Sequence, residues 1–298
     1  MLFRSIDAVM REAGGFRMGP FELMDLIGHD VNFAVTKSVW EAMFHDPRYA
    51  PSPIQRELVA AGFLGRKSGR GFYEHGAAAS APSPQALPGS PAPSRIAVHG
   101  EPGLLKPLVD RIAASGIAVR RLPAHPGFPD GAIDAGSAWL ALTDGRTATA
   151  RAAATGAPNV VLVDLALDYA AAKRLAIAAA DHCDASALGA AAGVLQQAGA
   201  AVSRMDDAAG LAVMRTVAML VNEASDAAMQ GIATPADIDL AMQKGVNYPR
   251  GPLAWGDAIG PARVAGVLAN LAAHYGEDRY RISPRLARAA QAGGRLGA

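Results

Sequence analysis

The chain contains two copies of one sequence module. Residues 6–28 recur as residues 238–260, at a constant offset of 238 − 6 = 232. The recurring residues are Ile6-Asp7, Met10, Gly19-Pro20, Asp25 and Ile27-Gly28, matched by Ile238-Asp239, Met242, Gly251-Pro252, Asp257 and Ile259-Gly260. After a one-residue slip, Ser52-Pro53 recurs as Ser283-Pro284. This offset is too long for a solenoid repeat and predicts a duplicated helical domain with other material between the copies.

The two copies begin differently. Before the second copy, residues 211–230 form an amphipathic stretch that predicts a helix, and Thr234-Pro235 predicts the cap and first position of the next one. The first copy has only five residues before Ile6, too few for a helix of about 20 residues, or about 30 Å. We therefore expect the natural protein to have a longer amino-terminal part, with a genuinely short start as the alternative.

Composition narrows the classes of function. A length of 298 residues predicts two or three domains, and a hydrophobic content of 51% is ample for a core. The formal charge of +1 gives no reason to expect a nucleic-acid or anionic-membrane partner. Cys183 is the only cysteine, which excludes an internal disulfide and favours a reducing compartment. With neither a membrane span nor a signal peptide in the sequence, we expect a cytoplasmic protein.

The composition and the predicted secondary structure change in the middle of the chain. Residues 77–94 are rich in Ala, Pro and Ser, have no charge before Arg95 and predict a linker with little to bury. Beyond them, apolar runs at residues 96–98, 117–119, 139–142 and 160–163 predict strands, and residues 104–114 predict a helix. Alternating strands and helices predict βαβ units and a parallel sheet.

The first predicted strand leads into Gly100-Glu101-Pro102-Gly103, where a dinucleotide-binding protein has its glycine turn. Only two glycines are available there, Glu101 would place a negative charge beside a phosphate, and Pro102 lacks an N–H donor. No acidic residue follows at the ribose position, where Arg120 and Arg121 stand instead. We expect a Rossmann-like scaffold that does not bind a nucleotide, and we identify no cofactor-binding residue.

Two longer motifs resemble a known family. Residues 15–28, together with residues 65–73 (Gly-Arg-Lys-Ser-Gly-Arg-Gly-Phe-Tyr), are similar to the carboxy-terminal domain of the L-3-hydroxyacyl-CoA dehydrogenase family. Residues 221–224 and 245–257 resemble the second such domain of long bacterial members, the 3-hydroxybutyryl-CoA and 3-hydroxyadipyl-CoA dehydrogenases. The resemblance implies an amino-terminal Rossmann domain that binds NAD and an all-helical domain that completes the substrate cleft and forms a dimer interface.

The resemblance also implies hydride transfer to NAD, with a histidine base held by a glutamate and assisted by serine and asparagine. The serine, histidine and glutamate belong to the amino-terminal domain. The asparagine position of the second copy is occupied by Met214, whose thioether cannot replace an amide donor. We therefore identify no catalytic residue in this chain and expect it to be inactive alone.

Several other polar residues are candidate sites. His182 and Cys183, flanked by Asp181 and Asp184, invite a nucleophile or metal interpretation, but no second histidine stands at ligand spacing, so we expect no metal site. His29, His45 and His274 are expected to be surface or capping groups. Glu22 and Asp25 lie three residues apart on one helix, and because Glu22 becomes Ala254 while Asp25 is kept as Asp257, a helix-terminal role is favoured over catalysis.

One basic cluster is a candidate substrate site. Arg66, Lys67 and Arg70 lie between glycines and could contact a phosphate of coenzyme A; the alternative is a solvated turn.

We predict a mixed fold of four parts: an incomplete all-α domain at 1–76, a linker at 77–94, a degenerate Rossmann-like α/β domain at 95–205 and a second all-α domain at 206–298. The resemblance implies the carboxy-terminal part of an NAD-dependent dehydrogenase of fatty-acid or phenylacetate-type catabolism. The expected partners are an acyl-CoA substrate and either another subunit or an internal pseudo-dimer. The alternative is a non-catalytic acyl-CoA-binding or assembly module.

Overall fold

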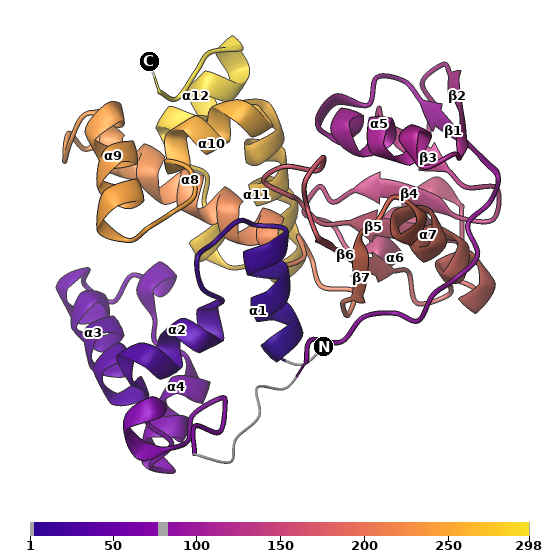
Figure 1. The fold of residues 1–298 in the computed structure, drawn as a ribbon. Helices are drawn as coiled ribbons and strands as arrows, with labels where there is room; N and C mark the ends of the chain where they lie inside the picture. Colours follow the sequence, from indigo (N-terminus) through magenta and orange to yellow (C-terminus); the bar gives the residue numbers. More distant parts are fainter. Residues whose placement is uncertain (1–2, 77–82, 298) are drawn as a thin grey trace.

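The computed structural model describes residues 3–76 and 83–297 and combines one mixed sheet with two groups of helices (Figure 1). The first group contains α1 (Phe3–Glu12), α2 (Pro20–Ile27), α3 (His29–Ala42), η1 (Pro47–Tyr49), α4 (Pro53–Ala60) and η2 (Arg66–Ser68). The second contains α8 (Val213–Met229), α9 (Pro235–Gly245), α10 (Pro252–Ile259), α11 (Pro261–Tyr275), η4 (Asp278–Tyr280) and α12 (Pro284–Ala292). The mixed fold class is as predicted.

The sequence repeat is also a structural repeat. Helices α1, α2 and α3 correspond to α9, α10 and α11, and η1 and α4 correspond to η4 and α12. Helix α8, which packs against α9, α10, α11 and α12, has no counterpart in the first group within the part of the chain that the structure describes.

The same hydrogen-bonded helix cap occurs in both repeats. The Asp7 carboxylate accepts the backbone N–H groups of Phe21 and Glu22 at 2.9 and 3.0 Å, at the start of α2. In the second copy, the Asp239 carboxylate accepts those of Leu253 and Ala254 at 2.8 and 2.9 Å. A carboxylate there satisfies free donors and suits the positive end of the helix.

The aspartate of the same helix cap explains why each Gly-Pro pair requires a glycine. A Cβ on Gly19 would come within 2.2 Å of Asp7, and one on Gly251 within 2.3 Å of Asp239. Both glycines have ordinary negative φ angles, −72° and −62°, so close approach, and not backbone conformation, requires them. In each repeat, the aspartate of the Ile-Asp pair therefore packs against the glycine of the Gly-Pro pair, which explains why both pairs recur.

The sheet lies between the two groups in sequence. Its strands are β1 (Arg95–His99), β2 (Ala118–Leu122), β3 (Ala132–Asp134), β4 (Trp139–Leu142), β5 (Val160–Val163), β6 (Arg174–Ala179) and β7 (Ala201–Arg204), in the order β2-β1-β3-β4-β5-β6-β7. The helices among them are η3 (Gly103–Leu105), α5 (Lys106–Ala114), α6 (Ala148–Thr155) and α7 (Ala185–Gln197).

The prediction of a parallel sheet is wrong. The pairs β1/β2, β4/β5 and β6/β7 are parallel, but β1/β3, β3/β4 and β5/β6 are antiparallel. Strands β3 and β4 are joined by a tight turn in which Ala135 N–H donates to Ala138 O at 2.9 Å, and residues 164–173 join β5 to β6 without a helix. Short connections of this kind allow only antiparallel neighbours, because a parallel pair needs a crossover.

The predicted linker falls partly outside the described residues, at 77–82. Its remaining part, 83–94, forms neither a helix nor a strand, yet it lies against the sheet. Leu87 N–H donates to Val202 O at 2.7 Å, and Ser203 Oγ donates to Gln85 O at 2.7 Å. Gly193 on α7 contacts the Pro91 backbone so closely that a Cβ would come within 2.6 Å of it. None of the residues 83–94 is buried, as predicted, but hydrogen bonds fix this part of the linker to the sheet.

The two repeats contact each other through equivalent residues. Phe16 and Tyr248, which are related by the repeat offset of 232, meet with ring centroids 5.6 Å apart. The turns η1 and η4 also contact each other, and Arg279 Nη2 donates to Pro47 O at 3.4 Å. Contact between equivalent parts is typical of a two-fold interface.

Candidate functional site

The basic cluster lies on one turn of the first repeat, at η2. Lys67 forms an ion pair with Asp30, and the Arg70 guanidinium stacks over the Phe63 ring with 4.1 Å between its carbon and the ring centroid. The Arg66 side chain is exposed and has no bonded partner among the residues described. The structure thus brings the three cations to one turn, but two of them already have local partners.

A buried carboxylate holds this turn in place. Asp25 accepts the N–H groups of Phe72 and Tyr73, both at 2.9 Å, and contacts Nε2 of His29 at 2.8 Å and Nε2 of His75 at 2.7 Å. The expected helix-terminal role of Asp25 is therefore wrong, because its partners lie on the returning chain and on two histidines.

The second copy reuses this arrangement without histidines. Asp257 accepts the N–H groups of Leu296 and Gly297 at 2.6 and 3.1 Å. Glu22, by contrast, has the predicted capping role, since its carboxylate accepts Gly19 N–H at 3.2 Å.

The expectation that His29 is a surface or capping group is also wrong. Its side chain is completely buried beside Asp25, so it is not a surface group. Its position four residues after Asp25, across Gly28, is the sequence signal for this pair. His45 and His274 are exposed, as predicted.

The stability of the first repeat should depend on pH through Asp25. Burial raises the pKa of its carboxyl, but hydrogen bonds from His75, Tyr73, Phe72 and His29 outweigh burial and lower the pKa below 3.8. Because the folded pKa is the lower one, the unfolded chain binds more protons, so stability is lost as pH falls from about 5 through the folded pKa. Urea unfolding between pH 2.5 and 6 should show this loss.

Asp25→Asn provides the control for this measurement. The variant should be less stable at pH 6 and should have a shallower acid dependence than the original chain. An unchanged acid slope would show that other carboxylates produce the loss.

The glycine turn of the α/β unit does not suit a nucleotide. A hollow of about 480 Å³ follows β1 and β2 and is lined by Gly100, Glu101, Arg121 and Asp130. The Asp130 carboxylate lies so close to Gly100 that a Cβ there would be 2.1 Å from its oxygen. Two carboxylates thus stand where a pyrophosphate would need donors, so the residues do not fit NAD.

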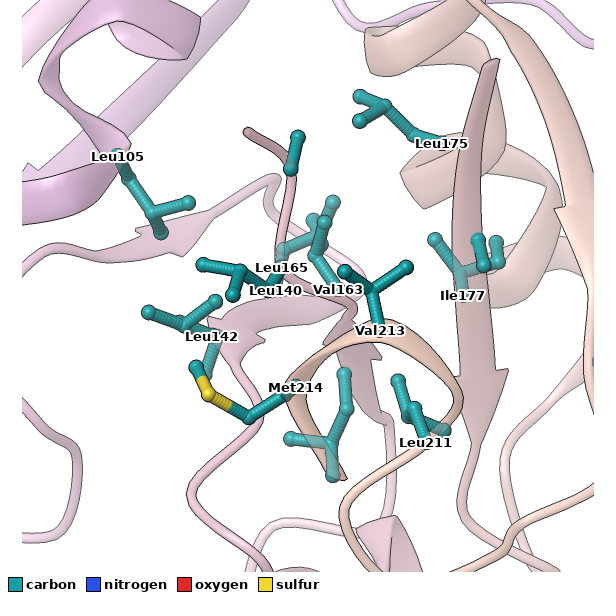
Figure 2. Packing of buried hydrophobic residues seen from close by; sticks show 14 of the residues in the cluster. Leu105, Leu140, Leu142, Val163, Leu165, Leu175, Ile177, Leu211, Val213 and Met214 are labelled. Carbon is teal, nitrogen blue, oxygen red and sulfur yellow. The ribbon is translucent and has the colours of Figure 1, made fainter. Parts of the chain in front are cut away.

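Met214, in the first turn of α8, packs into the core against the sheet. Figure 2 shows it beside Leu142, with Leu140, Leu165 and Leu211 in the same cluster. Its side chain is fully buried, so the position equivalent to the family's asparagine is filled by apolar packing.

The neighbouring Asp164 is buried and caps α8 by accepting the N–H groups of Ala212, Val213 and Met214 at 2.7–3.0 Å. Burial raises the pKa of this carboxyl to about 6 despite those bonds.

His182 and Cys183 lie in the turn after β6, with His182 exposed. Asp181 N–H donates to Thr149 Oγ1 and Asp184 N–H donates to Asn159 Oδ1, both at 2.9 Å. Burial raises the pKa of the Cys183 thiol, which makes it a poorer nucleophile. Within residues 3–76 and 83–297, no group of three or more His, Cys, Asp or Glu could hold a metal ion.

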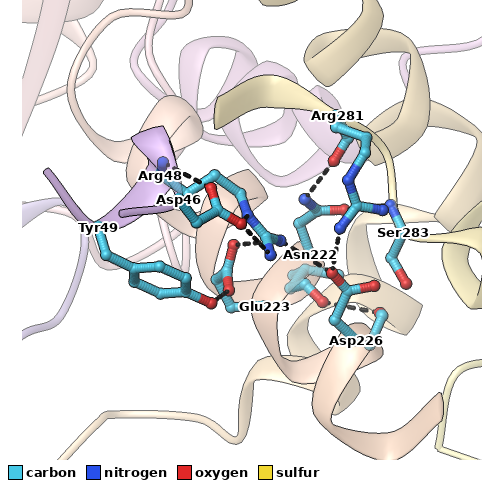
Figure 3. Close-up of polar contacts among 10 residues, drawn as sticks. Asp46, Arg48, Tyr49, Asn222, Glu223, Asp226, Arg281 and Ser283 are labelled. Atoms are coloured by element: carbon cyan, nitrogen blue, oxygen red, sulfur yellow. Dashed lines mark hydrogen bonds and ion pairs between the residues drawn. The ribbon is translucent and has the colours of Figure 1, made fainter. Parts of the chain in front are cut away.

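A polar cluster that the sequence reasoning missed joins the two repeats (Figure 3). Arg48 on η1 is only 8% exposed and contacts Asp46 at 3.0 Å, Asp226 at 2.9 Å and Glu223 at 3.5 Å. Tyr49 OH donates to Glu223 Oε2 at 2.9 Å. Burial and the Glu223 carboxylate raise the pKa of Tyr49 to about 12, so the phenol stays protonated.

On the α8 side of this cluster, Asn222 ties α8 to the start of α12. Its amide donates to Arg281 O and accepts Ser283 N–H, both at 2.8 Å. Asp226 also receives Arg281 Nη2 at 2.9 Å. The signal that could have revealed the cluster is the repeated Arg-Tyr pair of the two equivalent turns, at 48–49 and 279–280.

No helix within the described residues is long and apolar enough to cross a membrane.

Comparisons with known proteins match these features. The model of the 3-hydroxyacyl-CoA dehydrogenase C-terminal domain matches residues 2–75 and again 210–298. The model of the 3-hydroxybutyryl-CoA dehydrogenase reduced Rossmann-fold domain matches residues 140–208. The same family thus accounts for both helical repeats and for most of the sheet between them.

Individual proteins similar to this chain are dehydrogenases of the same family. The 3-hydroxyadipyl-CoA dehydrogenase of Escherichia coli K12 is 42% identical over 276 residues, which are 93% of this chain and 51% of that protein. A probable 3-hydroxybutyryl-CoA dehydrogenase of Bacillus subtilis is 42% identical over 71 residues, 24% of each chain. The crystal structure of the 3-hydroxybutyryl-CoA dehydrogenase of Escherichia coli K12 aligns with a TM-score of 0.83 at 38% identity, covering 98% of this chain and 55% of that one. The chain spans about half the length of the relatives that match it nearly throughout.

Proposed function

Because this chain belongs to the 3-hydroxyacyl-CoA dehydrogenase family, whose C-terminal domain model matches it twice, we propose that it is the carboxy-terminal portion of an NAD-dependent 3-hydroxyacyl-CoA dehydrogenase. Such an enzyme oxidises the 3-hydroxyl group of an acyl-CoA to a 3-oxo group, with NAD as the hydride acceptor. The observation that carries the proposal is the 42% identity over 93% of the chain. The names of the relatives point to a short acyl group, 3-hydroxybutyryl or 3-hydroxyadipyl.

The proposed division of labour assigns NAD to a separate domain. The turn at Gly100 does not suit NAD because of Glu101 and Asp130, and the apolar packing of Met214 leaves no amide donor at the α8 start. The chain would instead supply helical surfaces to the substrate and to the assembly. Arg66, Lys67 and Arg70 would contact a phosphate of coenzyme A, with Arg66 the one that can do so without giving up a local contact.

The helical repeats would act as an internal pseudo-dimer. Support comes from the contacts between equivalent parts, Phe16 with Tyr248 and η1 with η4. The first repeat also exposes an apolar face on α2 and α3 whose counterpart on α10 and α11 lies against α8. In the assembled dehydrogenase, a helix equivalent to α8 would cover that face.

A fusion tests the proposal. The amino-terminal half of the Escherichia coli 3-hydroxyadipyl-CoA dehydrogenase is joined to this chain at the position where their similarity begins. NADH formation is followed at 340 nm with 3-hydroxybutyryl-CoA and 3-hydroxyadipyl-CoA. We expect the fusion to form NADH at least about tenfold faster than either part, a difference of about 1.4 kcal/mol in activation free energy.

Each half alone is the control, and we expect this chain alone to form no NADH. A fusion that unfolds cooperatively in urea but oxidises neither substrate would contradict the proposal. If such a fusion still bound acyl-CoA, the non-catalytic acyl-CoA-binding module would be the better account.

A further inference from the structure

One side of α1, which carries Ser5, Val9 and Glu12, lies against the α/β unit. Glu12 pairs with Arg174 on β6 at 3.1 Å. Ser5 Oγ accepts the N–H of Gln85, in the linker segment that lies on the sheet, at 2.9 Å. Val9 lies on the same side of the helix, because residues three and four apart share a face, and it is completely buried. The α/β unit thus covers this side of the first repeat (Figure 1).

The equivalent side of α9 is exposed. At the repeat offset of 232, the three residues of α1 correspond to Asp237, Ala241 and Lys244, and all three are exposed. Leu240, next to them, is 52% exposed. In Figure 1, α9 lies at the opposite end of the molecule from the sheet. The second repeat therefore has an open helix side where the first repeat has an α/β unit.

The relation between the repeats indicates what belongs on this side. Equivalent parts of the two repeats contact each other, and a two-fold arrangement gives equivalent surfaces equivalent surroundings. The α/β unit that covers α1 precedes the second repeat in sequence. The two-fold counterpart of this unit is an α/β domain that precedes the first repeat and covers α9. The proposed function supplies such a domain, namely the one that binds NAD.

We propose that the amino-terminal NAD-binding domain of the complete dehydrogenase docks on the side of α9 formed by Asp237, Ala241 and Lys244. The inference rests on the proposed function. In this arrangement, each α/β domain precedes one repeat in sequence and contacts the other repeat in space. Two such contacts, together with the contact between the repeats, hold the two halves of the protein to each other.

One replacement specifies the charge of the docking domain. Glu12, which pairs with Arg174, is replaced by Lys244 in the second repeat. The Lys244 side chain is exposed and has no bonded partner among the residues described. Because complementary charges favour the correct partner, the NAD-binding domain should carry a carboxylate where the α/β unit carries Arg174.

Thiol labelling of the fusion described above tests this contact. In a Cys183→Ser background, Ala241→Cys supplies one thiol within the proposed contact, and its alkylation rate is measured in this chain alone and in the fusion. We expect the thiol to react at least about tenfold more slowly in the fusion, because the docked domain covers it. Adding Lys244→Glu should restore fast labelling, because it places like charges opposite each other.

Two matched variants control for other causes. Ala292→Cys on α12 should react equally fast in the chain and in the fusion, because Ala292 and its counterpart Ala61, at the offset of 292 − 61 = 231, are both exposed. Arg288→Glu reverses an exposed cation that, like Lys244, has no bonded partner among the residues described. It should leave the protection of Ala241→Cys unchanged. Cooperative urea unfolding verifies that each variant is folded.

Equal labelling of Ala241→Cys in the chain and in a fusion that forms NADH would overturn the docking surface and leave the proposed function standing. Protection that Arg288→Glu removes as readily as Lys244→Glu would also overturn it, because the protection would then depend on net charge and not on α9. Protection that only Lys244→Glu removes, in a fusion that forms no NADH, would support the docking surface and count against the proposed function.

Discussion

Arg48→Met should destabilise the chain by about 3 kcal/mol, because it removes a buried cation from the buried Asp226 carboxylate and from the partly exposed Asp46 and Glu223. Arg48 is 8% exposed and Asp226 is 5% exposed, so neither charge can be rehydrated without moving the chain. Asp226 would keep Arg281 and Glu223 would keep Tyr49, which places the expected cost at the lower end of the range for a broken buried pair. The midpoint of urea unfolding at pH 7 measures it.

The comparison with an exposed pair makes this prediction specific. Lys106→Met breaks an ion pair with Asp110 in which both side chains are more than half exposed, and it should cost less than about 1 kcal/mol. If the two variants had similar midpoints, the η1 cluster would be a solvated surface network and not a joint between the repeats. Limited proteolysis should also cut the first repeat faster in Arg48→Met, because its contact with α8 is weakened.

The local parts of this fold could be predicted from the sequence. Thr234 caps α9 by accepting Asp237 N–H at 3.2 Å, and Pro235 is the first residue of that helix, as predicted. Strands β4 and β5 occupy the predicted residues 139–142 and 160–163. In each case the signal lies within a few residues, where capping chemistry or a run of β-branched and large apolar side chains determines the conformation.

Strand β6 could not be predicted in this way. It reads Arg-Leu-Ala-Ile-Ala-Ala, a composition that favours a helix, and it forms a strand because all six residues are buried where it pairs between β5 and β7. Small side chains fit between covering layers, but that is a tertiary reason. The antiparallel placement of β3 and β6 likewise depends on connections whose path the pattern does not specify.

Among the candidate sites, too, only those whose residues are neighbours in sequence could be predicted. The cations at 66, 67 and 70 could be found because they are neighbours in sequence, and the role of their cluster stays a prediction. The contact of Arg48 with Asp226 spans 178 residues, and no local pattern connects the two. Similarly, Asp25 holds Phe72 and Tyr73, 47 and 48 residues away, so its environment could not be read from its own helix.

Two isoleucines at the same position of the two repeats should respond very differently to truncation. Ile259 on α10 is 6% exposed and Ile27 on α2 is 44% exposed, although their positions differ by the repeat offset of 232. Ile259→Ala should cost about 2–5 kcal/mol through lost burial and a residual cavity, whereas Ile27→Ala should cost less than about 1 kcal/mol. Urea unfolding of both variants in the chain as it stands measures the contrast.

The contrast arises because α8 packs on α10 and α11, while the equivalent face of the first repeat is bare. Leu23, Ile27, Val35 and Val39 are each more than 40% exposed, and their counterparts Trp255, Ile259, Val267 and Leu271 are buried. In the fusion described above, a helix equivalent to α8 should cover that face, and the cost of Ile27→Ala should rise toward that of Ile259→Ala. A high cost in the chain alone would mean that another copy already covers the face, whereas a low cost in an active fusion would show that catalysis does not require it to be covered.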